Sequence, residues 1–173
     1  IIANCHDRKS LQRLTADTKV VLTTVGPYAK YGSALVEACV MNGTHYCDLA
    51  GEVHWIRKMI DQFQTHAEKS GARIVQSCGF DSIPSDIGVW LLQREAKKYH
   101  GKACPEIKLL VQSMKGGASG GTFSSIMHTL QESRRNHSIA KILVEPYALN
   151  PVDNRSGPDD KDQIGIQFND NSG

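Results

Sequence analysis

The first hundred or so residues alternate between short apolar segments and helical patterns, and this alternation restricts the possible folds more than any other feature. Strands are predicted at 1–4, 20–25, 45–48 and 73–78, and helices at 7–14, 33–41, 53–69 and 84–99. Short loops between alternating strands and helices are typical of βαβ units, whose strands are parallel. The sequence therefore predicts an α/β fold with a doubly wound parallel sheet.

The pattern changes near residue 100. A longer strand is predicted at 106–114, and a glycine-rich segment at 116–121 precedes another helix. The end of the chain is rich in Asn, Asp, Pro and Gly, a composition that favours loops. We therefore predict two units, at 1–103 and 104–173, with a loop-rich tail from about residue 146.

Composition excludes several classes of protein. The 173 residues carry a formal net charge of +2 without a basic stripe, so nothing supports a nucleic-acid partner. No apolar run approaches the ~18 residues of a membrane-spanning helix, so membrane association is not indicated. The five cysteines lack C-x-x-C spacing, which predicts free thiols, no metal site and a cytoplasmic location. Because the chain begins with Ile1 rather than Met, we expect an internal fragment of a longer protein.

Three motifs follow predicted strands, at 25–28, 47–52 and 78–86. Because the carboxyl ends of parallel strands meet at one edge of an open sheet, and ligands bind at that edge, the motifs should lie together. Gly26 and Pro27 would let a flat ligand approach closely, or they form a simple strand-to-helix turn. Asp48 and Glu52 could orient a substrate or accept a proton. Alternatively, Glu52 complements the dipole of the helix that follows it.

Two further segments resemble binding sites for anions. Asp81 and Ser85 lie at the start of a predicted helix, whose N-terminus would favour a cofactor phosphate or a substrate carboxylate, although helix capping also explains Ser85. The glycine-rich segment at 116–121, followed by Thr122, is similar to an anion-binding loop, or it is a flexible turn. It lacks the G-K-[ST] ending of a nucleotide-binding P-loop.

Together these motifs resemble the saccharopine dehydrogenase-like oxidoreductases, and especially their bacterial branch labelled trans-acting enoyl reductase. The matching segments are VVLTTVGPYAKY (20–31), GTHYCDLAGE (43–52), CGFDSIPSDIG (78–88) and GASGGT (117–122). The resemblance implies the C-terminal portion of a Rossmann-type dinucleotide-binding domain at 1–103. It also implies the beginning of an α+β substrate or oligomerisation domain at 104–173.

The resemblance further implies a hydride transfer between a nicotinamide cofactor, NADP or NAD, and a C=N, C=C or C=O bond of a small-molecule substrate. The family's phosphate-binding glycine loop would precede Ile1, so tight cofactor binding by this chain alone is not expected. The predicted catalytic residues are Asp81, Tyr28 and Glu52. The predicted cofactor-binding residues are Val25, Gly26, Pro27, Tyr28, Gly79 and Phe80. The predicted substrate-binding residues are Asp48, Ser82, Pro84, Ser85, Ser119 and Thr122.

Two other functions stay open from the residues alone. The chain could be a non-catalytic Rossmann-like module for protein association, because no side chain is an unambiguous acid or base. It could also be a cysteine-dependent hydrolase built on Cys78, with His45 or His54 close in space. We also expect a homo-oligomer, because an open apolar sheet edge tends to pair with another chain.

Overall fold

A three-stranded parallel sheet forms the centre of the computed structural model, which describes residues 3–113, 115–117 and 119–155. The strands are β1 (Val20–Thr23), β2 (His45–Asp48) and β3 (Ile74–Val75), in that spatial order. Residues 20–23 pair with 45–48, and 46–47 pair with 74–75, so all three strands end at the same edge of the sheet. The predicted α/β class is confirmed, and the sheet is consistent with a partial Rossmann-like fold.

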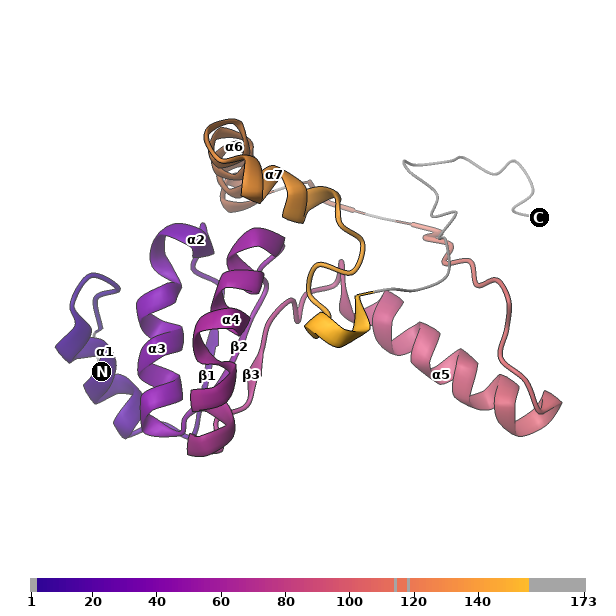
Figure 1. The fold of residues 1–173 in the computed structure, drawn as a ribbon, viewed down its shortest axis with the longest axis horizontal. Coiled ribbons are helices and arrows are strands. Elements are labelled where there is room, and N and C mark those ends of the chain that lie inside the picture. The colour runs from indigo at the N-terminus through magenta and orange to yellow at the C-terminus, as the bar shows by residue number, and fades with distance from the viewer. Residues whose placement is uncertain (1–2, 114, 118, 156–173) are drawn as a thin grey trace.

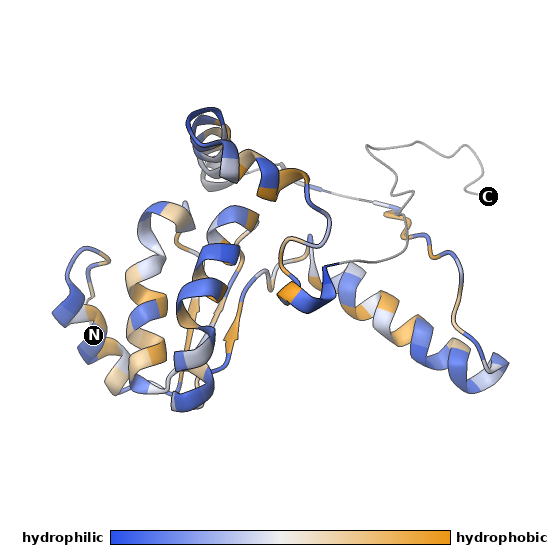
Figure 2. Cartoon of the chain, viewed as in Figure 1, coloured by the Kyte–Doolittle hydropathy of each residue, from blue (hydrophilic) through white to orange (hydrophobic). Residues whose placement is uncertain are grey.

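Three helices lie side by side over one face of this sheet (Figure 1). They are α1 (Arg8–Ala16), α3 (Ser33–Asn42) and α4 (Val53–Ser70). Tyr46 of β2 packs into a buried core with Val36, Trp55 and Met59 of the helices. Apolar side chains of β1 and β3 on the other face stay exposed, Leu22 at 68%. Figure 2 shows hydrophobic colour on the strands, which lie behind helices of mixed colour.

Local signals place the ends of these helices where the sequence predicts them. The Asp7 carboxylate accepts a hydrogen bond from the backbone N–H of Lys9 at 3.0 Å and so caps α1. Gly43 ends α3 with φ 68° and Gly71 ends α4 with φ 77°, a left-handed conformation that favours glycine. The predicted helix boundaries are therefore confirmed to within one or two residues in this part of the chain.

The remaining helices lie around or beyond the sheet edge (Figure 1). The short helix α2 (Tyr28–Tyr31) follows β1, and α5 (Ile83–His100) projects away from the sheet. Helices α6 (Gly120–Arg135) and α7 (His137–Val144) are joined at Asn136 and lie near α2. A 3-10 turn, η1 (Val152–Asn154), follows them. Among the described residues, no helix combines the length and hydrophobicity that crossing a membrane requires.

Two strand predictions are wrong over their described residues, and two other strands are shorter than predicted. The strand predicted at 20–25 ends at Thr23. Residues 106–113 form no strand, because no described strand lies beside them and an unpaired strand has no ladder of hydrogen bonds. Ala3 and Asn4 lie outside any strand. Met114, Ile1 and Ile2 lie outside the described residues. The strand predicted at 73–78 is limited to 74–75, because the backbone turns at Ser77, where φ is 58°.

The tail predicted from about residue 146 contains turns and η1 as far as residue 155, and 156–173 lie outside the described residues. Arg57 of α4 holds this segment. Its guanidinium donates to the carbonyl oxygens of Ala148 at 3.3 Å and Asn150 at 3.2 Å, and to Asp61 at 2.6 Å. The predicted division at 103/104 stays a prediction.

Candidate functional site

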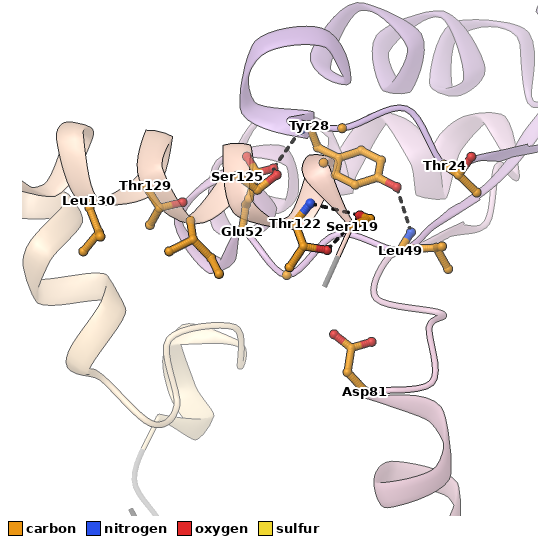
Figure 3. Close-up of a pocket in the computed structure, with 14 residues that line it drawn as sticks. Thr24, Tyr28, Leu49, Glu52, Asp81, Ser119, Thr122, Ser125, Thr129 and Leu130 are labelled. Carbon is orange, nitrogen blue, oxygen red and sulfur yellow. Dashed lines mark hydrogen bonds between the residues drawn. The ribbon is translucent and has the colours of Figure 1, made fainter. Parts of the chain in front are cut away.

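A pocket of about 350 Å³ opens at the carboxyl edge of the sheet, beneath α6 (Figure 3). Its walls come from the loops after β1 and β2, from the turn before α5 and from one face of α6. Six of the predicted site residues line it: Gly26, Tyr28, Glu52, Asp81, Ser119 and Thr122. The fold thus brings residues of four separate sequence motifs to one cavity, as expected for the ligand-binding edge of a parallel sheet.

Tyr28 forms one wall of the pocket. Its ring is 5% exposed and stacks on Trp55, with the ring centres 5.6 Å apart. The hydroxyl donates to the carbonyl oxygen of Thr23 and accepts from the backbone N–H of Leu49, both at 3.2 Å. Burial raises the pKa of Tyr28 above its usual value of 10.0. The phenol therefore stays protonated at neutral pH and holds a fixed place at the edge of the sheet.

Glu52 is a buried carboxylate that connects three parts of the site. It is 3% exposed, and it accepts hydrogen bonds at 2.8 Å from the backbone N–H groups of Tyr28 and Ala29. The hydroxyl of Ser125 on α6 donates to it at 2.8 Å. Glu52 stands at the N-cap of α4, but its side chain makes no capping bond there. The carboxylate therefore satisfies the start of α2 rather than the helix that follows it.

Asp48 lies outside the pocket lining. It is fully buried, and its carboxylate accepts from the backbone N–H groups of Ala50 at 2.9 Å and Ser77 at 3.0 Å. The Tyr46 hydroxyl donates to it at 2.8 Å. Burial raises the pKa of Asp48 above 3.8, although these hydrogen bonds oppose the shift. Its present contacts fix the strand end, and its predicted contact with substrate stays a prediction.

Asp81 lies in the turn before α5 and faces the pocket from below α6 (Figure 3). It is exposed and forms no hydrogen bond or ion pair with any described residue. The other residues predicted at this helix start do not line the pocket. Ser82 occupies the N-cap position of α5, but its side chain makes no capping hydrogen bond. Pro84 lies in the first turn of the helix. Ser85 is inside the helix, where its hydroxyl donates to the carbonyl oxygen of Ser82 at 2.8 Å.

Ser119 and Thr122 form the start of α6. The Ser119 hydroxyl accepts from the backbone N–H of Thr122 at 3.2 Å, and the two hydroxyl oxygens are 3.1 Å apart. Ser119 is therefore the N-cap of α6, and helix capping accounts for the contacts of both residues. Both residues also line the pocket. Four of the predicted cofactor-binding residues lie outside the lining: Val25, Pro27, Gly79 and Phe80.

Sequence reasoning missed eight residues of the lining: Thr24, Leu49, Gly51, Gly121, Ser125, Ile126, Thr129 and Leu130. Two of them, Leu49 and Gly51, lie within the 47–52 motif. The α6 residues share one helical face. The helical spacing of the polar residues Thr122, Ser125 and Thr129 is the sequence pattern that indicates this face. The apolar residues of α6 do not by themselves indicate which face of the helix is covered, because Phe123 is 66% exposed.

The charges of the lining are only acidic in the described part of the chain. Glu52 and Asp81 are carboxylates, and no Lys, Arg or His lines the pocket. Leu49, Ile126 and Leu130 add an apolar wall. The pocket therefore suits an uncharged, partly apolar ligand better than an anion. Among the described residues, no group of three or more His, Cys, Asp or Glu could hold a metal ion.

Cys78 lies outside this lining. Burial raises the pKa of its thiol, so the thiolate that a cysteine nucleophile requires is disfavoured. Of its two candidate bases, His45 already accepts a hydrogen bond from the backbone N–H of Arg73 at 3.1 Å. His54 lies 3.2 Å from Glu132. These contacts give the hydrolase hypothesis no support.

The fold and the pocket define a class: an α/β protein with a partial Rossmann-like parallel sheet and a candidate ligand site at its carboxyl edge. Comparison of the sequence with known proteins narrows this class. A Mycobacterium tuberculosis protein provisionally named a trans-acting enoyl reductase is 42% identical over 142 residues, which are 82% of this chain and 34% of that protein.

Two further relatives carry the name without qualification. The trans-acting enoyl reductase of Mycobacterium bovis is 37% identical over 150 residues, 86% of this chain and 36% of the relative. That of Mycobacterium ulcerans is 36% identical over 160 residues, 92% of this chain and 38% of the relative. The chain thus spans about a third of the length of the curated relatives it matches. No family model matches the sequence, and no solved structure matches it.

Proposed function

We propose that the pocket at the strand ends is part of the reaction site of an NAD(P)H-dependent, enoyl-reductase-like oxidoreductase, of which this chain is a segment. The observation that carries the proposal is the meeting of Tyr28, Asp81 and an apolar wall at the carboxyl edge of the sheet. The names of the relatives supply the reaction type. In this proposal the protein is saccharopine dehydrogenase-like, with residues 1–103 in its dinucleotide-binding domain and 104–173 beginning its substrate domain.

The lining suits the flat, uncharged ring of a reduced nicotinamide. A Cβ at Gly26 would lie 3.6 Å from both Ser125 and Tyr28, so glycine leaves space there that a larger side chain would fill. The pyrophosphate of NADP or NAD has no such fit, because no cationic side chain lines the described pocket. We therefore assign the nicotinamide half of the cofactor, but not its phosphates, to these residues.

When bound, the reduced cofactor supplies a hydride to one carbon of the enoyl C=C bond. The other carbon needs a proton, and Tyr28 is the proposed donor: its hydroxyl proton, which the carbonyl oxygen of Thr23 accepts at 3.2 Å, would turn to the substrate. Asp81 is exposed at the same pocket and would return a proton from solvent to the phenolate oxygen. Leu49 and Ile126 would exclude water from the reacting carbons.

Glu52 has a positioning role in this proposal. Oε1 of Glu52 accepts from the Tyr28 N–H and the Ser125 hydroxyl, and Oε2 accepts from the Ala29 N–H, so three hydrogen bonds fix the carboxylate in place. By fixing the backbone of Tyr28 it fixes the ring that carries the proposed donor. Glu52 was predicted as catalytic, and its geometry favours support of Tyr28 instead.

The test uses the full-length protein, because the chain spans about a third of its relatives. NADPH and NADH fluorescence titrations would measure cofactor binding, and crotonyl-coenzyme A would serve as the enoyl thioester. We expect NADPH or NADH to be consumed only when the thioester is present. A folded full-length protein that binds neither cofactor would overturn the proposal.

A second function, protein association without catalysis, is favoured by exposed apolar side chains. Leu22 on β1 is 68% exposed, and Trp90 and Leu92 on α5 are 57% and 51% exposed. Surfaces of this kind commonly mark contacts with other chains. We propose that the protein is a homo-oligomer under either function. Sedimentation of the full-length protein tests this, since a monomer at micromolar concentration contradicts it.

A further inference from the structure

A second hollow, of about 340 Å³, lies between α2 and the C-terminal half of α6. Lys30 on α2 and His128, Gln131 and Arg135 on α6 line it, together with Glu132 and Asn136. It shares the two helices with the first pocket but uses another face of α6. Where the first pocket has only acidic charges, this one has three basic side chains.

The two permanent cations of the hollow are unpaired within the described chain. Lys30 and Arg135 are exposed, and neither forms an ion pair or a side-chain hydrogen bond with another described residue. Two cations from different helices line one hollow, and neither forms an ion pair with a described carboxylate, so together they attract an anion there.

The described lining of the hollow contains one carboxylate, that of Glu132. Oε2 of Glu132 lies 3.2 Å from Nε2 of His54, a side chain of α4 that is 5% exposed. The same oxygen lies 3.9 Å from Nδ1 of His128. Glu132 thus lies beside both histidines, and the two cations Lys30 and Arg135 against this one carboxylate leave the hollow with a net positive charge.

His128 adds a partly buried imidazole to the hollow. Its side chain is 16% exposed, and its Nδ1 is buried without a hydrogen bond to any described residue. Buried polar atoms in proteins are generally hydrogen-bonded, so an unpaired one beside a basic hollow is consistent with a site that a ligand completes.

We propose that this hollow binds a phosphate group, held by the guanidinium of Arg135, the ammonium of Lys30 and the imidazole of His128. Arginine suits the task because its planar fork can donate two parallel hydrogen bonds to phosphate oxygens. The phosphate can be free or part of an ester, since the recognised chemistry is the same. The proposal does not depend on the reductase activity, because it uses none of the residues that line the first pocket.

The experiment is calorimetric titration of the full-length protein at low salt with inorganic phosphate, and separately with adenosine monophosphate. Arg135→Ala should weaken binding of either probe by about tenfold, as expected for loss of a charge-assisted contact. Arg134→Ala is the matched control: it removes the same charge from the neighbouring residue, which does not line the hollow. Arg135→Lys should restore part of the affinity.

The two probes separate the sources of the phosphate. Equal affinity for both indicates a site for the phosphate group itself, whereas tighter binding of adenosine monophosphate, with the same dependence on Arg135, indicates a phosphate ester. Equal weakening by Arg134→Ala and Arg135→Ala would show only general charge attraction and would overturn the proposal. Absence of binding by the folded protein would also overturn it, even if NADPH still bound at the first pocket.

Discussion

The hydroxyl of Ser125 donates a 2.8 Å hydrogen bond to the carboxylate of Glu52, although the two residues are 73 positions apart in the sequence. This bond ties α6 to the loop that follows β2 and closes one side of the candidate pocket. The same carboxylate oxygen also accepts from the backbone N–H of Tyr28. The position of the pocket wall and the position of the proposed proton donor therefore depend on one side chain.

Glu52→Gln tests this connection. The amide keeps one acceptor oxygen but places an NH2 group against a backbone N–H of α2, so one hydrogen bond becomes a clash of donors. We expect the free energy of unfolding to fall by about 1–3 kcal/mol, the cost of an unsatisfied buried group. Ser125→Ala removes only the bond to α6 and should cost less. Urea denaturation of both variants measures the difference, and equal stability of Glu52→Gln and the parent would contradict the role given to Glu52.

Gly32 lies where α2 meets α3, against the ring of Trp55. A Cβ at this position would approach Cζ2 of Trp55 to 2.7 Å and the carbonyl oxygen of Tyr28 to 2.9 Å. We expect Gly32→Ala to lower the free energy of unfolding by about 1–3 kcal/mol through overpacking. Gly88→Ala in α5 is the control, because a Cβ there meets nothing within 4 Å. Alanine should stabilise that helix by up to about 1 kcal/mol. Thermal denaturation of the two variants should therefore give shifts of opposite sign.

The buried carboxyl group of Asp48 should make the stability of the protein depend on pH. Because burial raises its pKa in the folded state, folding favours the protonated carboxyl. Its contribution to stability is therefore complete below the ordinary pKa of 3.8 and is lost as the pH rises through the raised value. Asp48→Asn can keep the contacts, since the amide oxygen accepts from Ala50 and Ser77 while the NH2 donates to the Tyr46 hydroxyl.

As the pH rises from 4 to 7, the free energy of unfolding of Asp48→Asn should therefore increase relative to that of the parent protein. The comparison of the two proteins cancels the titration of the other carboxyl groups. Urea denaturation at several pH values measures it. A constant difference between the two proteins across this range would show that Asp48 does not titrate as its burial implies.

Tyr28→Phe separates catalysis from packing. The ring stays stacked on Trp55, but the hydroxyl that accepts from Leu49 is lost. If Tyr28 donates the proton, kcat of the full-length protein should fall by about 10²-fold or more, with a smaller change in KM. Tyr31→Phe, on the same short helix but outside the pocket, should leave kcat unchanged. A kcat for Tyr28→Phe within twofold of the parent would exclude Tyr28 as the donor.

The sequence predicted the elements best where their signals are local. The strand at 45–48 has the predicted bounds, and the helices that end at Gly43 and Gly71 do so because left-handed glycines stop a helix without help from distant residues. The prediction at 106–114 is wrong over its described part because an alternating pattern makes a strand only when another strand lies beside it. The alternation of residues can be seen in the segment itself, but the hydrogen bonds of a strand come from a neighbouring strand elsewhere in the chain.

The sequence by itself determined the α/β class and the edge at which the strand-end motifs meet, since the direction of parallel strands follows from alternating elements and short loops. Only the tertiary structure decided which residues face the pocket. It turned Glu52 away from its own helix toward α2, buried Asp48 beneath the strand ends, and placed the Thr122, Ser125 and Thr129 face of α6 over the cavity. The physical reason is that these contacts join residues far apart in the chain, and their geometry depends on how α6 packs over the sheet edge, which no local spacing encodes.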